Sequence, residues 1–522
     1  MSRTPLFREV KRTLRLAARL EASGLPTAEG LDRLATRHEP RAWSRRRFLQ
    51  AAGVAAGALV APRLARPARA MSGSEVVIVG AGAAGLACAY RLQQHGVEAR
   101  VIEAGTRVGG RIHSLRNAFP EGQVTELGAE FIDSDHTALL SLASELGLAV
   151  DDLAYVGGTS GNVFAFEGRV IRHDNQLLEA FRPVAAKILE EIGPEGEHCE
   201  VRFDHATPEG RELDATSLAE WLSSRGFTGL IAEVLKTAYL GEYGLEPEEQ
   251  STLNLLCLVG LEPPPVEIYG ESDERFHLAG GNDGLTQRLG QALPRPVELG
   301  TRLEAIRPSG SRYELTVSRG GGQSRDALAA DVVVLALPFT LLRQVDLQVE
   351  LPEVKRRAIA ELGYGTNAKL ICGFGKRVWT EAGATGAVFT DLGFQACWET
   401  SRGQAGVHGI LTNFLGGTAG ARLHEGTAEA HARRFAAQLD KVFPGAAKAA
   451  TGQAVRFAWP THPLSLGSYS CYRPGQYASL RGAEGFAVGA LHFCGEHTSS
   501  RFGGFMNGAV ESGERVAREI LD

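Results

Sequence analysis

A short apolar run followed at once by a glycine-rich turn constrains the fold of this chain more than any other feature. Residues 75–79 read Glu-Val-Val-Ile-Val, the continuous hydrophobic pattern of a strand buried on both faces of a parallel sheet. Residues 80–85 then read Gly-Ala-Gly-Ala-Ala-Gly. Gly80 permits a tight turn, Gly82 lets the backbone approach a pyrophosphate, and Gly85 allows close packing of helix on strand. The pattern predicts a dinucleotide-binding turn.

The residues after the glycine turn continue the same unit. A helix is expected over 86–95, with the N–H groups of its first turn directed at the phosphates. A second strand over 99–102 leads into Glu103, at the position where an acid binds ribose hydroxyls. A glycine-rich turn alone is common, but strand, turn, helix, strand and acid in this order are specific. We therefore predict a Rossmann-like cofactor domain.

Charge is distributed unevenly along the 522 residues. Residues 1–70 carry fifteen Lys or Arg and five acids, whereas the remainder carries 40 basic and 56 acidic residues. An acidic body excludes nucleic-acid binding, which needs cations against phosphate, and it attracts cationic substrates. The seven cysteines are scattered, with no CxxC and no Cys/His cluster, so neither a disulfide framework nor a metal site is predicted.

The first seventy residues read as an export signal. Residues 44–50 read Ser-Arg-Arg-Arg-Phe-Leu-Gln, a twin-arginine pattern, and a weakly apolar run and a small-x-small cleavage site at 68–70 follow. The run is too short to span a membrane. A basic helix is the alternative, because five apolar residues have helical spacing: Leu6, Val10, Leu14, Ala17 and Leu20. We expect the twin-arginine translocase to export the folded protein to the periplasm or beyond.

Glycine-rich and apolar segments elsewhere extend the pattern over the rest of the chain. They are Gly105 to Arg111 (GTRVGGR), Leu127 to Ile132 (LGAEFI), Gly280 to Leu285 (GGNDGL), Ala330 to Pro338 (ADVVVLALP), Phe493 to Thr498 (FCGEHT) and Gly503 to Gly513 (GGFMNGAVESG). Together these segments resemble the motifs of the flavin amine oxidase superfamily, which contains monoamine, polyamine and L-amino-acid oxidases. The matches run from about residue 74 to residue 522.

The resemblance implies an α/β fold with discontinuous domains. A Rossmann-like FAD-binding domain (GR2-type) would be assembled from residues 74–150, 271–345 and 450–522. An α+β substrate domain with a mixed sheet would use residues 151–270 and 346–449.

The resemblance also implies which residues contact FAD. The glycine motifs, the acid Glu103 and the two ends of the chain supply them. The predicted FAD-binding residues are Gly80, Gly82, Ala83, Ala84, Gly85, Glu103, Ala104, Arg111, Gly128, Ala129, Glu130, Phe131, Leu303, Pro338, Trp459, Gly495, Glu496, Gly504, Phe505 and Met506.

Lys369 is the first candidate for chemistry. It stands in an otherwise apolar strand, where an ordinary lysine would lie on a half-exposed face. It resembles the family lysine that contacts flavin N5 through a water. A cation there would stabilise negative charge on the flavin and assist reaction with oxygen.

Three aromatic residues are the other catalytic candidates. Residues 459–469 resemble the family segment Trp-x-x-Asp-Pro followed by Gly-Ser-Tyr, which places Trp459 beside the flavin. Tyr469 and Phe505 would flank the substrate amine, with Tyr472 as the competitor for the position of Tyr469. His462 departs from the pattern because it replaces the usual Asp.

FAD is expected to be bound without a covalent link. Some family members attach flavin through a cysteine that precedes the first tyrosine of the aromatic pair. That position is Gly467 here, and Cys471 falls elsewhere.

The substrate is the most open prediction. The family's carboxylate-binding arginine is absent after residue 128, where Glu130 and Asp133 stand and offer an anchor for a distal ammonium group. We predict oxidation of a small primary or secondary amine, or of a polyamine, with oxygen as the acceptor. The alternative is L-amino-acid oxidation, with Arg402 binding the carboxylate and with oxygen or a quinone as acceptor. Lys369 and the aromatic pair argue against a flavin-dependent desaturase or isomerase. Retention of every flavin motif argues against a non-catalytic flavin protein. A monomer or homodimer is expected.

Overall fold

The computed structural model describes residues 17, 74–153, 163–172, 175–259 and 273–522. The predicted twin-arginine motif and cleavage site lie outside these residues. Ala17 is helical and fully buried, in a hydrophobic cluster that it shares with Phe181, Tyr239 and Leu256 of the helices described below.

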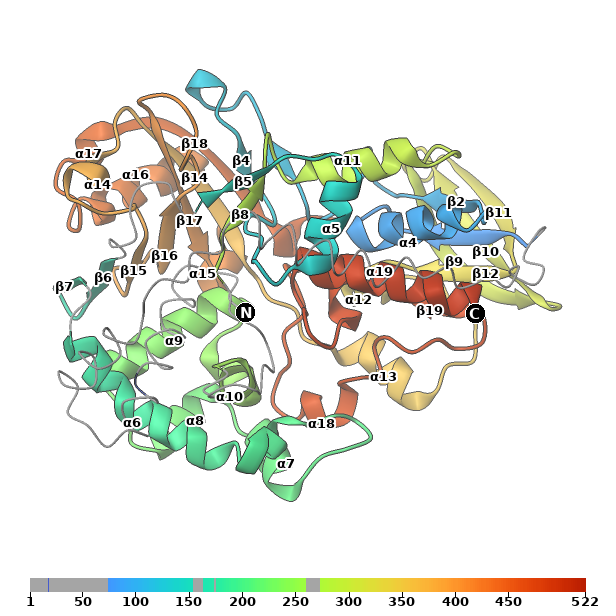
Figure 1. Cartoon of the computed structure of the whole chain (residues 1–522), viewed down its shortest axis with the longest axis horizontal. Coiled ribbons are helices and arrows are strands. Elements are labelled where there is room, and N and C mark those ends of the chain that lie inside the picture. The colour runs from blue at the N-terminus through green and yellow to red at the C-terminus, as the bar shows by residue number, and fades with distance from the viewer. Residues whose placement is uncertain (1–16, 18–73, 154–162, 173–174, 260–272) are drawn as a thin grey trace, which may run out of the picture.

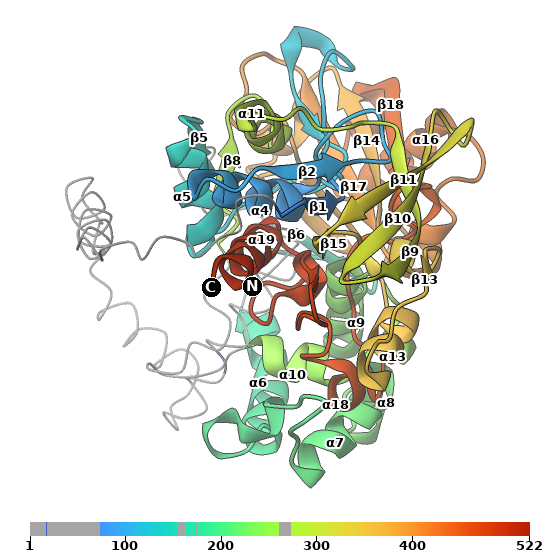
Figure 2. The same ribbon diagram turned by 90° about the vertical axis from the view of Figure 1, so that its right-hand side faces the viewer.

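A four-stranded parallel sheet carries the glycine turn. Its strands have the order β19-β12-β1-β2, with bounds β1 (Val76–Val79), β2 (Ala99–Ile102), β12 (Val332–Leu335) and β19 (Leu491–Phe493). All four residues of β1 are buried, as the continuous apolar run predicts. Helix α4 (Ala83–Gln94) leads from β1 back to β2, and the C-terminal helix α19 (Met506–Leu521) packs on α4 (Figures 1 and 2).

Glycines allow these helices to approach so closely. A Cβ atom at Gly85 would lie 2.1 Å from the carbonyl oxygen of Gly80, and one at Gly513 would lie 2.2 Å from that of Ala84. Gly85 therefore packs the helix on the turn, as the sequence predicts, and Gly513 does the same between α19 and α4.

A second sheet flanks the parallel one. Its order is β11-β10-β9-β13, with β9 (Thr301–Ser309), β10 (Arg312–Arg319), β11 (Ser324–Ala330) and β13 (Asp346–Leu347). Short strand pairs and helices complete this half of the molecule: β3 (Ser114–Leu115) with β4 (Thr125–Glu126), β5 (Val150–Asp152) with β8 (Phe276–Leu278), α5 (Thr137–Glu145), α11 (Asp283–Ala292), α12 (Phe339–Leu342) and α13 (Glu353–Glu361).

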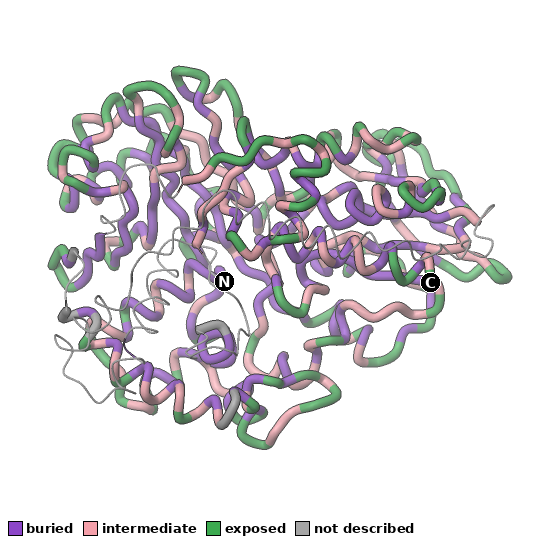
Figure 3. The backbone as a smooth tube through the Cα atoms, in the orientation of Figure 1, coloured by how far each residue is buried: buried purple, intermediate pink, exposed green. Residues whose placement is uncertain are grey.

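A seven-stranded mixed sheet forms the core of the other half. Its order is β18-β14-β17-β16-β15-β6-β7, with β6 (Val163–Phe166), β7 (Arg169–Arg172), β14 (Ala368–Phe374), β15 (Val388–Thr390), β16 (Ala396–Glu399), β17 (Gly409–Leu415) and β18 (Ala450–Ala458). The helices of this half are α6 (Asn175–Glu191), α7 (Pro208–Ala215), α8 (Leu218–Ser224), α9 (Leu230–Tyr243), α10 (Leu253–Val259), α14 (Val378–Glu381), α15 (Gly417–Ala421), α16 (Ala428–Leu439), α17 (Ala446–Ala449) and α18 (Gln476–Leu480). Figure 1 shows α6 to α10 gathered below this sheet. Figure 3 shows buried backbone in the inner strands: every residue of β14, β15 and β17 is buried, whereas the edge strand β18 is partly exposed.

The predicted α/β class with a mixed second sheet is confirmed, but two segments pair across the predicted domain boundaries. Strand β18 is assigned by sequence to the FAD part, yet it hydrogen-bonds to β14 in the seven-stranded sheet. Strand β13 lies just beyond the predicted boundary at residue 345, yet it pairs with β9. Strand pairing depends on a distant partner, which the local pattern does not specify.

No helix within the described ranges has the length and apolarity needed to cross a membrane.

Candidate functional site

One cavity of about 490 Å³ brings together the predicted site residues. This volume is typical of a site for a small molecule or cofactor. All predicted residues but Gly85, Asp133 and Arg402 line it: Gly80, Gly82, Ala83, Ala84, Glu103, Ala104, Arg111, Gly128, Ala129, Glu130, Phe131, Leu303, Pro338, Lys369, Trp459, Tyr469, Gly495, Glu496, Gly504, Phe505 and Met506.

The glycine turn leaves its backbone open toward the cavity. No heavy atom lies within 4 Å of the Cβ position of Gly82, so the chain makes room there for a group in contact with its main chain. The second glycine motif lies against the first, because the Gly109 amide donates a hydrogen bond to the carbonyl oxygen of Ala81 at 2.8 Å. Glu103 at the end of β2 accepts hydrogen bonds from the amides of Ala81 (2.9 Å) and Gly105 (2.7 Å).

These features fit a dinucleotide. The open turn at the N-terminus of α4 suits a pyrophosphate, and the carboxylate of Glu103 lines the cavity where ribose hydroxyls would bind. Met506 and Ala509 in the first turn of α19 also line the cavity, so a second helix N-terminus faces it.

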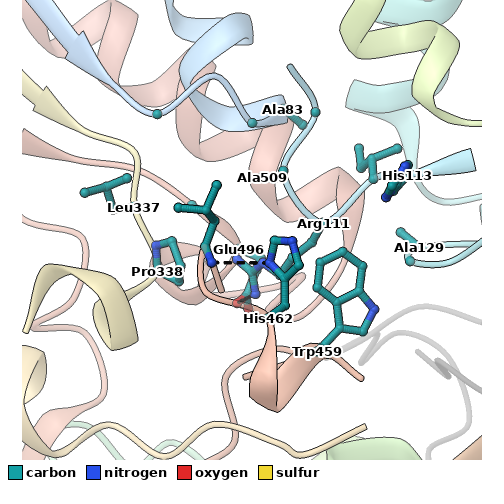
Figure 4. A pocket seen from close by; sticks show the side chains of 18 of the residues that line it. Ala83, Arg111, His113, Ala129, Leu337, Pro338, Trp459, His462, Glu496 and Ala509 are labelled. Atoms are coloured by element: carbon teal, nitrogen blue, oxygen red, sulfur yellow. Dashed lines mark hydrogen bonds and ion pairs between the residues drawn. The ribbon is translucent and has the colours of Figure 1, made fainter. Parts of the chain in front are cut away.

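Arg111 and Glu496 form an ion pair in this part of the cavity (Figure 4). The Nη1 atom of Arg111 donates to Oε1 of Glu496 at 2.7 Å and to the Ser468 carbonyl oxygen at 2.8 Å. Burial alone would raise the pKa of Glu496, but Arg111 and hydrogen bonds from Ser470 lower it to about 2. The amide of Gly504 also donates to this carboxylate, at 2.6 Å. The carboxylate thus joins three segments that are far apart in sequence.

Lys369 reaches the cavity from the seven-stranded sheet. It lies on β14, where its neighbours across the strands are Phe414 of β17 and Phe457 of β18. The residue is 3% exposed, and its ammonium group donates to Oε2 of Glu130 at 2.6 Å. It is therefore a buried cation with a direct counter-charge and not the half-exposed lysine of an ordinary strand.

The aromatic candidates line the cavity as well. Trp459 is buried and donates its indole N–H to the carbonyl oxygen of Leu127 at 2.9 Å. Phe505 precedes α19, and its ring meets that of His136 edge-on at 5.3 Å. Tyr469 lines the cavity, whereas its competitor Tyr472 stacks on Tyr477 outside it.

His462 lines the cavity beside Trp459, with ring centroids 5.6 Å apart (Figure 4). Burial lowers the pKa of His462. A neutral imidazole therefore stands at neutral pH where the resemblance leads one to expect a carboxylate.

Three predicted residues lie outside the cavity lining. Gly85 packs α4 on the turn, as described above. Asp133 is 1% exposed and accepts a hydrogen bond from the amide of Glu274 at 2.7 Å, so it joins two chain segments. Arg402 is half-buried in the turn between β16 and β17. Neither Asp133 nor Arg402 is among the described residues that line the cavity.

Sequence reasoning missed Trp398 of β16 and Phe414 of β17, which line the cavity next to Lys369. Ala396 pairs with Phe414, and Trp398 lies two residues further along β16, so both aromatic side chains share the face of Lys369. The sequence signal for these two residues was the alternation of side chains within each strand. Assigning them to the face of Lys369 also requires the register between strands, which only the structure supplies.

The chain matches the model of the flavin containing amine oxidoreductase family over residues 83–521. Among curated proteins, L-amino acid dehydrogenase of Synechocystis sp. is 24% identical over 465 residues, which covers 86% of this chain and 95% of that protein. Among solved structures, cyclohexylamine oxidase from Brevibacterium oxydans superposes with a TM-score of 0.73 at 24% identity, covering 86% of this chain and 98% of that one. Putrescine oxidase bound to putrescine superposes with a TM-score of 0.71 at 23% identity, covering 86% and 99%. The glycine turn, the paired arginine and glutamate and the match over most of its length show that this chain belongs to the flavin-containing amine oxidoreductases.

Proposed function

We propose that the enzyme oxidises a small primary or secondary amine with an apolar or aromatic substituent, using FAD and oxygen. The observation that carries this proposal is the composition of the cavity around Lys369. Phe131, Trp398, Phe414 and Tyr469 line the same cavity as Lys369, a buried cation that already has its counter-ion.

The overall reaction conserves atoms and electrons. The carbon next to the amine nitrogen loses a hydride and the nitrogen loses a proton, which leaves an imine that water hydrolyses to a carbonyl compound and ammonia or a smaller amine. When bound, FAD would supply the two-electron acceptor for that hydride, and oxygen would take up the two electrons and two protons to become hydrogen peroxide.

The residues of the chain orient the amine and control charge. The rings of Tyr469 and Phe505 line the cavity and offer π-faces that attract an amine and exclude water. Lys369 supplies a fixed positive charge from a buried strand, which stabilises negative charge as it develops beside it.

The acidic residues of the cavity are already paired within the protein, which favours a substrate with an apolar substituent over one with a second charge. Three glutamates line the cavity, and each is engaged within the protein: Glu103 with two amides, Glu130 with Lys369 and Glu496 with Arg111. A diamine needs an acid that is available to its second ammonium group. An amino acid needs a cation for its carboxylate, and Arg402 does not line the cavity. The arginines that do line it are engaged within the protein: Arg111 with Glu496, Arg107 with main-chain carbonyl oxygens and Arg302 with Gln344.

A substrate panel tests the proposal. Arylalkylamines, alicyclic amines, polyamines and L-amino acids are each mixed anaerobically with the FAD-loaded enzyme, and loss of the oxidised flavin absorbance is followed. Peroxide is then measured on admission of air. We expect apolar monoamines to reduce the flavin fastest, and reduction by amino acids alone would falsify the proposal.

FAD is expected to be released intact when the protein is precipitated with acid. A thioether needs a cysteine at the flavin, but all seven cysteines are buried and none of them lines the cavity. Cys471, the nearest in sequence to the position used by covalent members, is 0% exposed and accepts a hydrogen bond from Asn254 instead. The measurement is the flavin absorbance of the supernatant, and yellow colour left in the pellet would contradict the prediction.

A further inference from the structure

Glu130 joins the segment beside the FAD cavity to the sheet that carries Lys369. Its side chain is buried, and Oε2 accepts a hydrogen bond from the Lys369 ammonium group at 2.6 Å. The same ammonium group donates to the carbonyl oxygens of Glu126 at 3.1 Å and Gly128 at 2.8 Å. All three hydrogens of a protonated Lys369 therefore have acceptors, and the side chain is held in one orientation.

The second oxygen of Glu130 binds a different part of the site. Oε1 accepts the indole N–H of Trp398 at 2.9 Å and the hydroxyl of Thr400 at 2.6 Å. The Trp398 ring contacts Phe131 at 5.6 Å and Phe414 at 5.4 Å between centroids. One oxygen thus fixes the cation and the other fixes an aromatic wall of the cavity.

This geometry is poorly suited to substrate recognition by Glu130. Both carboxylate oxygens already accept hydrogen bonds from protein donors, and one of these donors carries a full positive charge. A substrate ammonium group at Glu130 would have to compete with Lys369 at 2.6 Å. Glu130 instead belongs to a buried hydrogen-bond network that fixes Lys369 and Trp398 together.

We propose that Glu130 is the positioning residue of the site, which holds the ammonium group of Lys369 and the ring of Trp398 in place together. The inference rests on the proposed function for its kinetic readouts. Loss of this one carboxylate should therefore impair two separate properties: the reaction of reduced enzyme with oxygen and the fit of the substrate.

Glu130→Gln is the direct test, because the amide keeps the shape but cannot accept hydrogen bonds on both sides. Its NH₂ group must face either Lys369 or the pair Trp398 and Thr400, and both the ammonium group and the indole N–H are donors that cannot accept from it. We expect KM for the amine to rise at least tenfold and the rate of flavin reoxidation to fall at least tenfold. Trp398→Phe should raise KM alone, since it leaves the ion pair with Lys369 in place.

Glu399 provides a matched control. It is likewise a poorly exposed glutamate that accepts from a cation and an indole, Arg377 at 2.6 Å and Trp379 at 2.7 Å, in the same sheet but away from the cavity lining. Glu399→Gln should lower the unfolding temperature and leave KM and the reoxidation rate unchanged. Equal kinetic effects of the two Gln variants would overturn the proposal, because they would indicate a general effect on folding.

Unfolding of the FAD-loaded protein across pH supplies a readout without turnover. In Glu130→Gln the buried ammonium of Lys369 has lost its counter-charge, so the folded state holds that proton less tightly than the unfolded chain does. The unfolded state then binds more protons, and stability should rise as pH is raised toward the ordinary range of lysine titration. The double variant with Lys369→Met lacks the ammonium and should unfold without this slope.

The outcomes separate the inference from the proposed function. If no amine reduces the wild-type flavin, the function fails, while the unfolding curves still decide about Glu130. If Glu130→Gln does not fold, the double variant, which carries no unpaired charge, is expected to recover folding. Parallel pH curves for the single and double variants, or a double variant no better folded than the single one, would overturn the positioning role.

Discussion

Replacing Arg111 by alanine is expected to lower the free energy of unfolding by about 3–5 kcal/mol and to weaken FAD binding. The guanidinium group forms the ion pair with Glu496 at 2.7 Å, and Glu496 lies almost fully buried, with 6% of its side chain exposed. Without the arginine this carboxylate would stay buried without a neighbouring cation. The measurement is denaturant unfolding at pH 7, together with titration of FAD into the stripped protein.

The same ion pair predicts how acid affects the protein. Against the opposing effect of burial, Arg111 lowers the pKa of Glu496 from its ordinary value of 4.5 to about 2. The folded protein therefore binds this proton less tightly than the unfolded chain, so the stabilisation is complete above pH 4.5. It is lost as pH falls from 4.5 toward 2. Arg111→Ala should lack this part of the acid transition.

Arg357 on the surface supplies the control for this prediction. It pairs with Glu361 at 3.0 Å, but 42% and 45% of the two side chains are exposed. Arg357→Ala should therefore change stability by less than about 1 kcal/mol. Arg111→Lys should retain part of the stability, because it keeps the charge but loses the planar guanidinium group. An Arg111→Ala protein with unchanged unfolding and FAD affinity would contradict the role of the pair.

Lys369→Met is expected to slow the reaction of reduced enzyme with oxygen by roughly 10²-fold or more. Methionine fills a similar volume but removes the only lysine among the described residues that line the cavity. Reduction of the flavin by amine should change less, since the aromatic walls remain. Stopped-flow mixing with amine without oxygen, and then of reduced enzyme with oxygen, measures the two half-reactions separately.

Lys355 allows this effect to be separated from the loss of any buried lysine. It is 0% exposed and lies over the rings of Phe486 and Phe493, outside the cavity lining. Lys355→Met should leave reoxidation unchanged. Equal reoxidation rates in wild type and Lys369→Met would remove Lys369 from the oxidative half-reaction.

The parts of the site that sequence predicts best are built from neighbours in the chain. Gly80 and Gly85 form the predicted turn and close helix packing, and Gly82 leaves its backbone open, because strand end, turn and helix start lie within a few residues of one another. Glu103 follows the next strand and reaches back to the turn at 2.9 Å. Such a unit can be predicted from the local sequence without information about the rest of the chain.

The parts that sequence did not predict depend on contacts between distant segments. Arg111 and Glu496 were each expected near the flavin, but their direct pairing joins residues 385 positions apart. Glu130 was considered as a substrate anchor because it stands where the carboxylate-binding arginine is absent. Its partners Trp398 and Thr400 could not be foreseen, since they lie about 270 positions away and the register of β16 was unknown. A one-residue shift of β16 would turn Trp398 to the opposite face of the sheet.

The buried position of Ala17 matters for the predicted cleavage of the signal segment after residue 70. It is fully buried within the hydrophobic cluster of α6 to α10, yet a peptidase that cuts after Ala70 would remove it. The precursor and the exported form would then differ in the interior of the substrate half and not only at a free end. If the predicted export takes place, cofactor loading and export would both act on the precursor, whereas catalysis would follow cleavage, so the properties of the precursor would not stand for those of the mature protein.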